Sequence, residues 1–192
     1  MPLYTRQGDC GTTGTANGER VSKSSTAIEM SGAFDEALRR IGAVTVKLDR
    51  VFKGGWADAE GSVEADIYAV STWSQHRLFT CAACAVNPAA TDSPISPDDV
   101  AAIERFTDRF SATVPLMRAF VLPGSTELCI RLDLARSAIR TVERATVRHS
   151  ASNEHPVSSD VLCFLNRLSD LYYAMARAAA AAFDASETEW QS

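Results

Sequence analysis

The chain has 192 residues, of which 46% are hydrophobic and 22% are charged. This is an ordinary globular composition, and a chain of this length buries a sizeable core without disulfides or metals. The net charge of −5 excludes a protein that binds nucleic acid through a general basic coat. Lysine occurs only at 23, 47 and 53, so arginine supplies the other basic side chains. Either the base composition of the genome or a site that gathers arginines around an anion accounts for this preference for arginine over lysine.

The N-terminus and the cysteines together predict a cytoplasmic protein. The first nine residues lack the apolar region of a signal peptide, and no stretch approaches the roughly 20 apolar residues of a membrane span. Five cysteines, an odd number, indicate reduced thiols. Cys81 and Cys84 form a CxxC pattern without a second pair or a suitably placed histidine. We therefore expect two buried, unreactive cysteines on one helix, and no metal site.

Residues 1–30 are rich in glycine, serine and threonine and predict a loop. A first helix is predicted over residues 34–52, where apolar side chains recur in steps of four and three before Gly54 and Gly55. A second helix is predicted over residues 62–86, followed by a proline-containing connector at 87–97. No alternating run predicts a strand anywhere in the chain.

Ser96 and Pro97 predict the start of a third helix, with Ser96 as its N-cap. Its apolar spacing continues to Met117, and Pro115 ends or kinks it. After the turn at Pro123-Gly124, a fourth helix is predicted over residues 128–148.

A linker at 151–156 precedes a fifth helix at 161–179, and the polar tail after Asp184 is expected to fray. The sequence therefore predicts one all-α domain, a five-helix bundle. Residues 1–31 form an N-terminal glycine- and threonine-rich loop segment, residues 32–184 the bundle and residues 185–192 the tail.

Two segments carry candidate chemistry. Arg136, Arg140 and Arg144 follow each other at one-turn spacing on the fourth helix beside Glu143, which predicts either a solvated charged face or an anion site. The segment 5–14 suits phosphate binding, because glycines let backbone N–H groups converge on an anion. It lacks the Gly-Lys-Ser/Thr ending of a Walker A loop.

Several single residues admit two interpretations each. Lys23 is either a phosphate-binding charge or a surface lysine. Asn166, Ser169 and Asp170 lie in the middle of the fifth helix, where they indicate either buried hydrogen bonds between helices or ligand contacts. Asp35 is expected at the start of the first helix, where it either interacts with the helix dipole or pairs with an arginine of another helix.

In this order, the residues resemble the PduO-type ATP:cob(I)alamin adenosyltransferase family over almost the whole chain. The matching blocks are Tyr4-Thr5, Gly8-Asp9, Gly11-Thr12-Thr13, Arg20-Val21, Lys23, Gly32, Asp35-Glu36, Gln75, Leu78-Phe79, Phe120-Val121-Leu122-Pro123-Gly124-Ser125, Ala135-Arg136, Arg140, Glu143-Arg144, Asn166-Arg167-Leu168-Ser169-Asp170 and Ala176-Arg177.

The resemblance implies a homotrimer with active sites between subunits, in which Co(I) of a corrinoid attacks the 5′ carbon of ATP and expels triphosphate. It implies ATP, Mg²⁺ and cobalamin as ligands, with no metal bound by the protein itself. A flavoprotein reductase and a B12-dependent enzyme are implied partners. The implied ATP contacts are Thr5, Arg6, Gln7, Gly8, Thr13, Gly14, Lys23, Arg140, Glu143, Arg144 and Asn166.

Four residues receive catalytic roles from the resemblance. Asp35 and Arg136 are expected to form an inter-subunit ion pair, and Arg140 to contact the phosphates. Phe120 is expected to line the corrin pocket and keep cobalt without its lower axial ligand, which eases reduction to Co(I). Because Co(I) is itself the nucleophile, the protein's tasks are positioning and stabilisation of the leaving group.

The sequence also departs from the family pattern. Cys10 and Thr141 stand where positively charged residues are usual, which removes two charges from near the phosphates. Gln7, Ala27 and Leu38 also differ from the residues usual at their positions. The alternative function is that of a non-catalytic ATP- or corrinoid-binding relative, a chaperone or sensor that kept the fold.

Overall fold

Five helices and one small hairpin make up the computed structural model, which describes residues 4–15, 18–51, 61–87, 94–116, 119–152, 156–186 and 188–190. The helices are α1 (Thr26–Val51), α2 (Val63–Val86), α3 (Pro97–Ser111), α4 (Glu127–Ala151) and α5 (Ser159–Ala182). Strands β1 (Thr12–Gly14) and β2 (Arg20–Ser22) pair antiparallel, with Thr13 opposite Val21. The predicted all-α five-helix bundle is confirmed.

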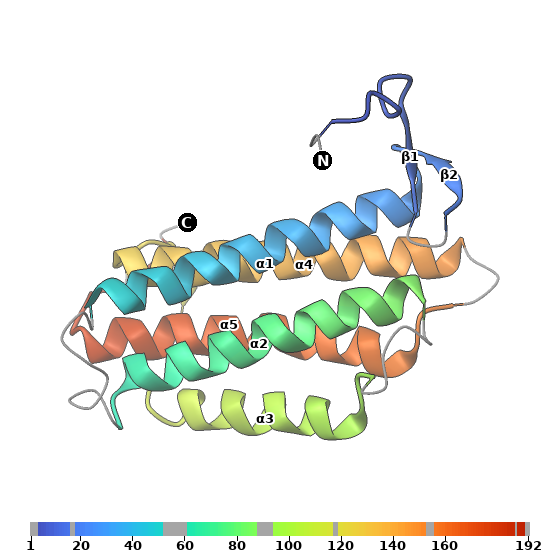
Figure 1. The fold of residues 1–192 in the computed structure, drawn as a ribbon. Helices are drawn as coiled ribbons and strands as arrows, with labels where there is room; N and C mark the ends of the chain where they lie inside the picture. Colours follow the sequence, from blue (N-terminus) through green and yellow to red (C-terminus); the bar gives the residue numbers. More distant parts are fainter. Residues whose placement is uncertain are drawn as a thin grey trace.

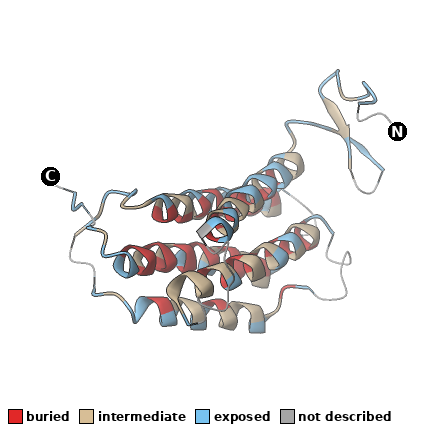
Figure 2. Ribbon diagram, turned by 60° about the vertical axis from the view of Figure 1, so that its left-hand side comes forward, coloured by how far each residue is buried: buried red, intermediate tan, exposed pale blue. Residues whose placement is uncertain are grey.

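The helices lie side by side with their axes roughly aligned (Figure 1). α1 packs against α2 and α4, and α5 packs against α2, α3 and α4. The β1–β2 hairpin rises from the start of α1 and stands away from the bundle (Figure 1). Its described residues are exposed or only partly buried, whereas buried residues gather where the helices face one another (Figure 2).

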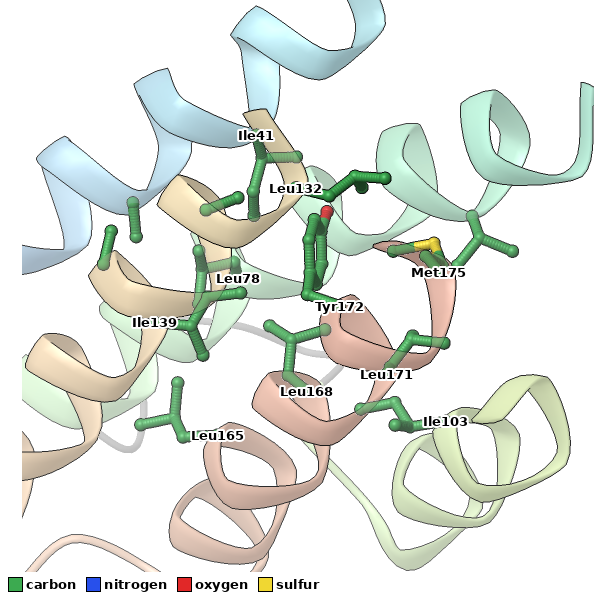
Figure 3. Packing of buried hydrophobic residues seen from close by; sticks show 14 of the residues in the cluster. Ile41, Leu78, Ile103, Leu132, Ile139, Leu165, Leu168, Leu171, Tyr172 and Met175 are labelled. Atoms are coloured by element: carbon green, nitrogen blue, oxygen red, sulfur yellow. The ribbon is translucent and has the colours of Figure 1, made fainter. Parts of the chain in front are cut away.

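All five helices contribute to one core. Around Tyr172 of α5, apolar side chains converge from the other four helices (Figure 3). They include Ile41 of α1, Leu78 of α2, Ile103 of α3 and Leu132 of α4, none of which is exposed to solvent. Full burial of each such side chain contributes about 1.5–3 kcal/mol to folding, so the predicted apolar stripes account for how the helices assemble. Cys81 and Cys84 are both buried on α2, as predicted.

Side-chain caps fix where the helices begin. Ser62 and Thr126 accept backbone hydrogen bonds from the third residue of α2 and α4, each at 3.1 Å. The predicted N-cap Ser96 is confirmed: its backbone N–H and its hydroxyl both donate to Asp99 at 3.0 Å. Arg77 of α2 also donates to Asp99, at 2.5 Å, and both side chains are only 16% exposed. This cap therefore ties α3 to α2.

The N-terminal third differs from prediction in two ways. The prediction that the chain contains no strand is wrong for β1 and β2, because three-residue strands are too short for alternation to be visible. α1 begins at Thr26, inside the segment expected to be a loop. Asp35 therefore lies more than two turns into the helix, and its predicted interaction with the dipole at the helix start is wrong.

The C-terminal half also corrects two expectations, the end of the third helix and the frayed tail. α3 ends at Ser111, and Pro115 lies just where a helical N–H would have bonded to the Ser111 carbonyl. Of the two interpretations of the polar residues in α5, buried hydrogen bonding fits Ser169, whose hydroxyl donates to the Asn166 carbonyl at 2.9 Å, but not the exposed Asp170. The tail was expected to fray, but residues 188–190 pair with the segment before α4. Phe52, Gly54, Gly55 and Met117 lie outside the described residues.

Candidate functional site

The hairpin brings the predicted phosphate loop and Lys23 together. A Cβ added at Gly8 would lie 3.2 Å from Lys23 Nζ and 3.3 Å from the Thr12 carbonyl oxygen. The ammonium group therefore occupies the space that a side chain at Gly8 would need. The Lys23 N–H donates to the Gly11 carbonyl at 2.9 Å, which extends the ladder beyond the strands. A side chain at position 8 would therefore crowd the lysine, which would have to move by a few tenths of an ångström.

Arg20 of β2 holds the same loop from the side. Its guanidinium donates to the Gln7 carbonyl and to the Thr12 hydroxyl. Gly11 has a φ of 78°, a left-handed conformation that favours glycine. The predicted contacts Thr5, Arg6, Gln7 and Gly14 are exposed, and Gly8 and Thr13 are partly buried. A loop with glycine amides, threonine hydroxyls and a nearby ammonium group has the donors that an anion needs.

The five arginines of α4 have different partners. Arg131 pairs with Glu127 at 2.8 Å and Arg148 with Glu29 of α1 at 3.0 Å. Lys47 of α1 also pairs with Glu127, at 2.6 Å. The arginines at the two ends of the helix therefore already have carboxylate partners, and they are not needed for an external anion.

The three central arginines lack a carboxylate partner among the described residues. Arg144 donates to the Thr141 hydroxyl at 3.1 Å, and Arg136 lies over the ring of Tyr173, 5.4 Å from its centroid. No hydrogen bond, ion pair or ring contact holds Arg140 within the described part of the chain, and its side chain is exposed. The arginines predicted to bind an anion are thus those whose charge no carboxylate of the described residues neutralises.

Asn166 of α5 joins α4 through a hydrogen bond. Its amide donates to Glu143 at 3.0 Å, and its carbonyl accepts from Arg167 at 2.6 Å. Arg167 in turn pairs with Glu104 of α3 at 3.2 Å. The expected hydrogen bonding between helices is therefore present at Asn166, and it fixes the orientation of Glu143 beside the arginines.

A pocket of about 260 Å³ lies where the segment before α4 meets α4 and α5. Its walls include Val121, Leu122, Gly124, Arg136 and Tyr173. Phe120 adjoins the first of these residues and is 73% exposed, so its ring is free to contact a ligand. Arg136 thus faces a partly apolar pocket beside the residue expected to contact a corrin.

Asp35 and Arg136 are not paired with each other within one chain. Asp35 forms an ion pair with Arg39 on its own helix. It lines an open groove of about 580 Å³ between α1 and α2, together with Gln75 and the exposed Phe79. The ion pair expected between subunits stays a prediction.

The two halves of the candidate site lie at opposite ends of the molecule. The hairpin stands beyond the start of α1, whereas the segment around Phe120 precedes α4 at the other end (Figures 1 and 2). α4 alone has 25 residues, which corresponds to about 37 Å at 1.5 Å per residue. One chain therefore does not bring its own phosphate loop to its own Phe120.

Residues 3–179 match the sequence profile of the family described as cobalamin adenosyltransferase. The chain belongs to this family. It is 34% identical to the corrinoid adenosyltransferase PduO of Citrobacter freundii, with 93% of this chain and 50% of that protein covered. It is 32% identical to the corrinoid adenosyltransferase of Bacillus subtilis, with 100% and 93% covered. The chain thus spans half the length of the Citrobacter relative and most of the Bacillus relative.

Solved structures have the same fold. A variant of the PduO-type ATP:corrinoid adenosyltransferase from Lactobacillus reuteri, complexed with cobalamin and ATP, superposes with a TM-score of 0.80. It is 24% identical, and both chains are covered completely. Another variant of that protein, complexed with ATP, gives a TM-score of 0.79 at 25% identity.

Two features of the site are not predictable from the sequence. Tyr173 under Arg136 is one of several residues on α5 with helical spacing, and only the packing of α5 on α4 reveals the contact. The pairing of residues 188–190 with the Phe120 segment has no sequence signal, because the paired stretch is too short to alternate.

Proposed function

We propose that this chain transfers the 5′-deoxyadenosyl group of ATP to Co(I) of a corrinoid. The observation that carries this proposal is the match to the cobalamin adenosyltransferase family over residues 3–179. The three arginines of α4 that have no carboxylate partner among the described residues support it, since the reaction releases a highly charged triphosphate.

In the proposed step, Co(I) donates its electron pair to the 5′ carbon of ATP. This pair becomes the cobalt–carbon bond, the bond between the 5′ carbon and oxygen breaks, and triphosphate leaves with the electron pair of that carbon–oxygen bond. Cobalt becomes formally Co(III), so no other oxidant is required. Reduction of Co(II) to Co(I) takes one electron, which a flavoprotein reductase supplies in this proposal.

ATP is held through its phosphates by the loop 5–14 with Lys23, and by Arg140 and Arg144. Glu143, oriented by the Asn166 amide, accepts a hydrogen bond from a ribose hydroxyl or an adenine amine. Phe120 presents its exposed ring to the corrin and excludes the lower ligand from cobalt. Such positioning replaces acid–base catalysis, because Co(I) needs no activation by a base.

We further propose a homotrimer in which each site lies between subunits. The separation of the hairpin from the Phe120 segment within one chain supports this arrangement (Figure 1). Charge supports it too, because Arg136 lacks a carboxylate partner among the described residues, and Asp35 is exposed on another helix. A head-to-tail contact gives a ring when the rotation from one subunit to the next closes, and the proposed trimer is such a ring.

Mg²⁺ accompanies ATP in this proposal. Among the described residues no three histidine, cysteine, aspartate or glutamate side chains gather into a metal site. The hard cation is therefore held mainly by phosphate oxygens, with threonine hydroxyls of the loop as additional ligands. We propose a cytoplasmic location and delivery of the product to a B12-dependent enzyme. None of the helices in the described part of the chain has the length and apolarity to cross a membrane.

The direct test is an absorbance assay. The protein is incubated with cob(II)alamin, a strong reductant and Mg-ATP, and the visible spectrum is followed. We expect the light-sensitive spectrum of adenosylcobalamin to appear only with ATP. Binding of ATP without this product would favour the alternative function, that of a non-catalytic relative. The uncharged residues Cys10 and Thr141, which stand where positively charged residues are usual, support that alternative.

Mixed trimers test the shared site. Lys23→Ala disables the loop and Arg140→Ala disables the helix, so each homotrimer is expected to be inactive. When the two variants are assembled together in equal amounts, about a quarter of the inter-subunit sites receive two intact halves. Recovery of about that fraction of activity supports the arrangement, and no recovery contradicts it.

A further inference from the structure

The phosphate loop is joined to the helical bundle through a short connector. In the described part of the chain, no hydrogen bond, ion pair or ring contact links residues 4–22 to any of the helices. The loop is bonded instead to Lys23, whose N–H donates to the Gly11 carbonyl, and α1 begins three residues later at Thr26. The direction in which the loop leaves the bundle therefore depends on how the start of α1 is held (Figure 1).

The start of α1 is not held by a side-chain cap. Ser25 precedes the helix, and its carbonyl accepts from the N–H groups of Ile28 and Glu29 at 3.1 and 3.0 Å. Its hydroxyl is buried and has no hydrogen-bond partner among the described residues. The hydroxyls of Ser62 and Thr126, by contrast, cap α2 and α4. The first turn of α1 consequently needs a partner outside its own helix.

That partner lies at the end of α4, which is beside the start of α1 (Figure 1). The Thr26 hydroxyl lies 3.1 Å from His149 Nδ1 and 3.1 Å from the Ser152 hydroxyl. The Ser152 hydroxyl in turn donates to the His149 carbonyl at 3.0 Å. His149 is only 8% exposed and Thr26 is partly buried, so the bond between them is partly shielded from water. We call these three residues the Thr26 cluster.

The number of hydroxyl protons fixes the direction of each bond in the Thr26 cluster. A hydroxyl has one proton to donate, and Ser152 donates its proton to the His149 carbonyl. Ser152 therefore accepts from Thr26, and this bond uses the only hydroxyl proton of Thr26. Thr26 must then accept from His149, so the proton between them belongs to Nδ1 of the imidazole. The cluster thus requires a donor at the δ position of residue 149.

We propose that His149 is a positioning residue for the phosphate loop. Its Nδ1–H fixes Thr26, Thr26 fixes the first turn of α1, and the connector of residues 23–25 passes this constraint to Lys23 and the loop. Because the loop acts together with Arg140 of a neighbouring subunit, its direction decides how often it is ready to receive the phosphates. The inference rests on the proposed function for the identity of the ligand, ATP, and on the geometry for the role of His149.

Two substitutions of His149 test the position of the donor. Asn has its amide nitrogen at the δ position, whereas the amide nitrogen of Gln lies one bond further from the backbone. We expect His149→Asn to keep the KM and the dissociation constant for ATP within about twofold of those of the unsubstituted protein. His149→Gln should raise both about fivefold, because one hydrogen bond less holds the loop in its binding orientation. The kcat at saturating ATP and the KM for the corrinoid should not change, since bound ATP itself selects that orientation.

Two variants elsewhere complete the comparison. Thr26→Val removes the acceptor but keeps nearly the same side-chain shape, and it should weaken ATP binding as His149→Gln does. Because Thr26 is only partly buried, this variant tests the proposal even if His149→Gln proves too unstable to assay. Arg148→Ala is the matched control, because it breaks the exposed ion pair that joins the same end of α4 to Glu29 of α1. We expect Arg148→Ala to leave ATP binding unchanged.

The direction of the loop is measured in the absence of ATP. Cys10 in the loop and Cys163 on α5 are exposed, whereas the other three cysteines are buried. Spin labels on the two exposed cysteines, in trimers diluted with unlabelled subunits, give the distance between loop and bundle by double electron–electron resonance. We expect a broader distance distribution for His149→Gln and Thr26→Val than for the unsubstituted protein, His149→Asn and Arg148→Ala.

The results distinguish this inference from the proposed function. If His149→Gln and Thr26→Val keep the distance distribution and the ATP affinity, or if His149→Asn fails as His149→Gln does, the inference is overturned and the proposed function stands. If the variants behave as expected in ATP binding and in loop distances, but the unsubstituted protein forms no adenosylcobalamin, only the proposed function fails. An unsubstituted protein that does not bind ATP refutes both.

Discussion

Arg140→Ala removes the exposed guanidinium of α4 that has no hydrogen-bonding, ionic or ring partner among the described residues. Its loss leaves no carboxylate without a partner, so the free energy of unfolding is expected to change by less than about 0.5 kcal/mol. At the transition state the same group stabilises the departing triphosphate. Loss of one such donor costs about 2.7–4 kcal/mol, or a fall in kcat of roughly 100- to 1000-fold.

Arg148→Ala is the matched control on the same helix. It breaks the ion pair with Glu29, in which the side chains are 64% and 55% exposed. Such a surface pair contributes only about 0–1 kcal/mol to stability, and turnover should stay close to that of the unsubstituted protein. The assay follows adenosylcobalamin formation from pre-reduced cob(I)alamin, with thermal unfolding measured in parallel. If Arg140→Ala keeps full turnover, or loses it only because the trimer falls apart, the phosphate role is refuted.

Three further predictions follow from the same contacts. Phe120→Ala should reduce turnover more with cob(II)alamin than with pre-reduced cob(I)alamin, and equal losses would contradict its role in removing the lower ligand. Asp99→Ala should lower the free energy of unfolding by about 2–3 kcal/mol, because the mostly buried Arg77 side chain and the cap of α3 both lose the Asp99 carboxylate as acceptor; an unchanged thermal midpoint would refute this. Hydrogen bonds, the largest from Lys47, lower the pKa of Glu127 from 4.5 to about 2. Because the pKa of Glu127 is lower in the folded than in the unfolded protein, the ionised carboxylate stabilises the fold above the unfolded pKa. This stabilisation is lost as the pH falls toward 2. The stabilities of the unsubstituted protein and Glu127→Gln should therefore converge between about pH 4.5 and 2, and parallel curves would rule the linkage out.

The helices were predictable because their apolar side chains repeat over many turns. Five apolar stripes of this kind predicted the number and order of the helices. The N-cap Ser96 also predicted the first residue of α3. Ends without a periodic signal were less predictable. α1 begins at Thr26, before the predicted stripe, and Met30, which lies four residues before Phe34 and is fully buried, extends the same apolar face in spite of Gly32.

The candidate site was predictable only in its parts. The arginine spacing predicted a candidate anion-binding face. It did not reveal that Arg131 pairs with a glutamate one turn earlier on α4, or that Arg148 pairs with a glutamate of α1. The loop composition suggested phosphate binding, but the approach of Lys23 to Gly8 depends on hairpin register. Contacts between segments far apart in sequence, such as residues 120–122 with 188–190, depend on the assembled fold.

The most direct measurement of the central claim follows the reacting carbon itself. ATP labelled with ¹³C at the 5′ position is mixed with the protein and pre-reduced cob(I)alamin under exclusion of oxygen. The products are then examined by carbon NMR and anion chromatography. We predict a labelled carbon bonded to cobalt and one intact triphosphate released for each corrinoid converted. Labelled ATP that stays unreacted, or that yields ADP and phosphate without a cobalt–carbon bond, would contradict it.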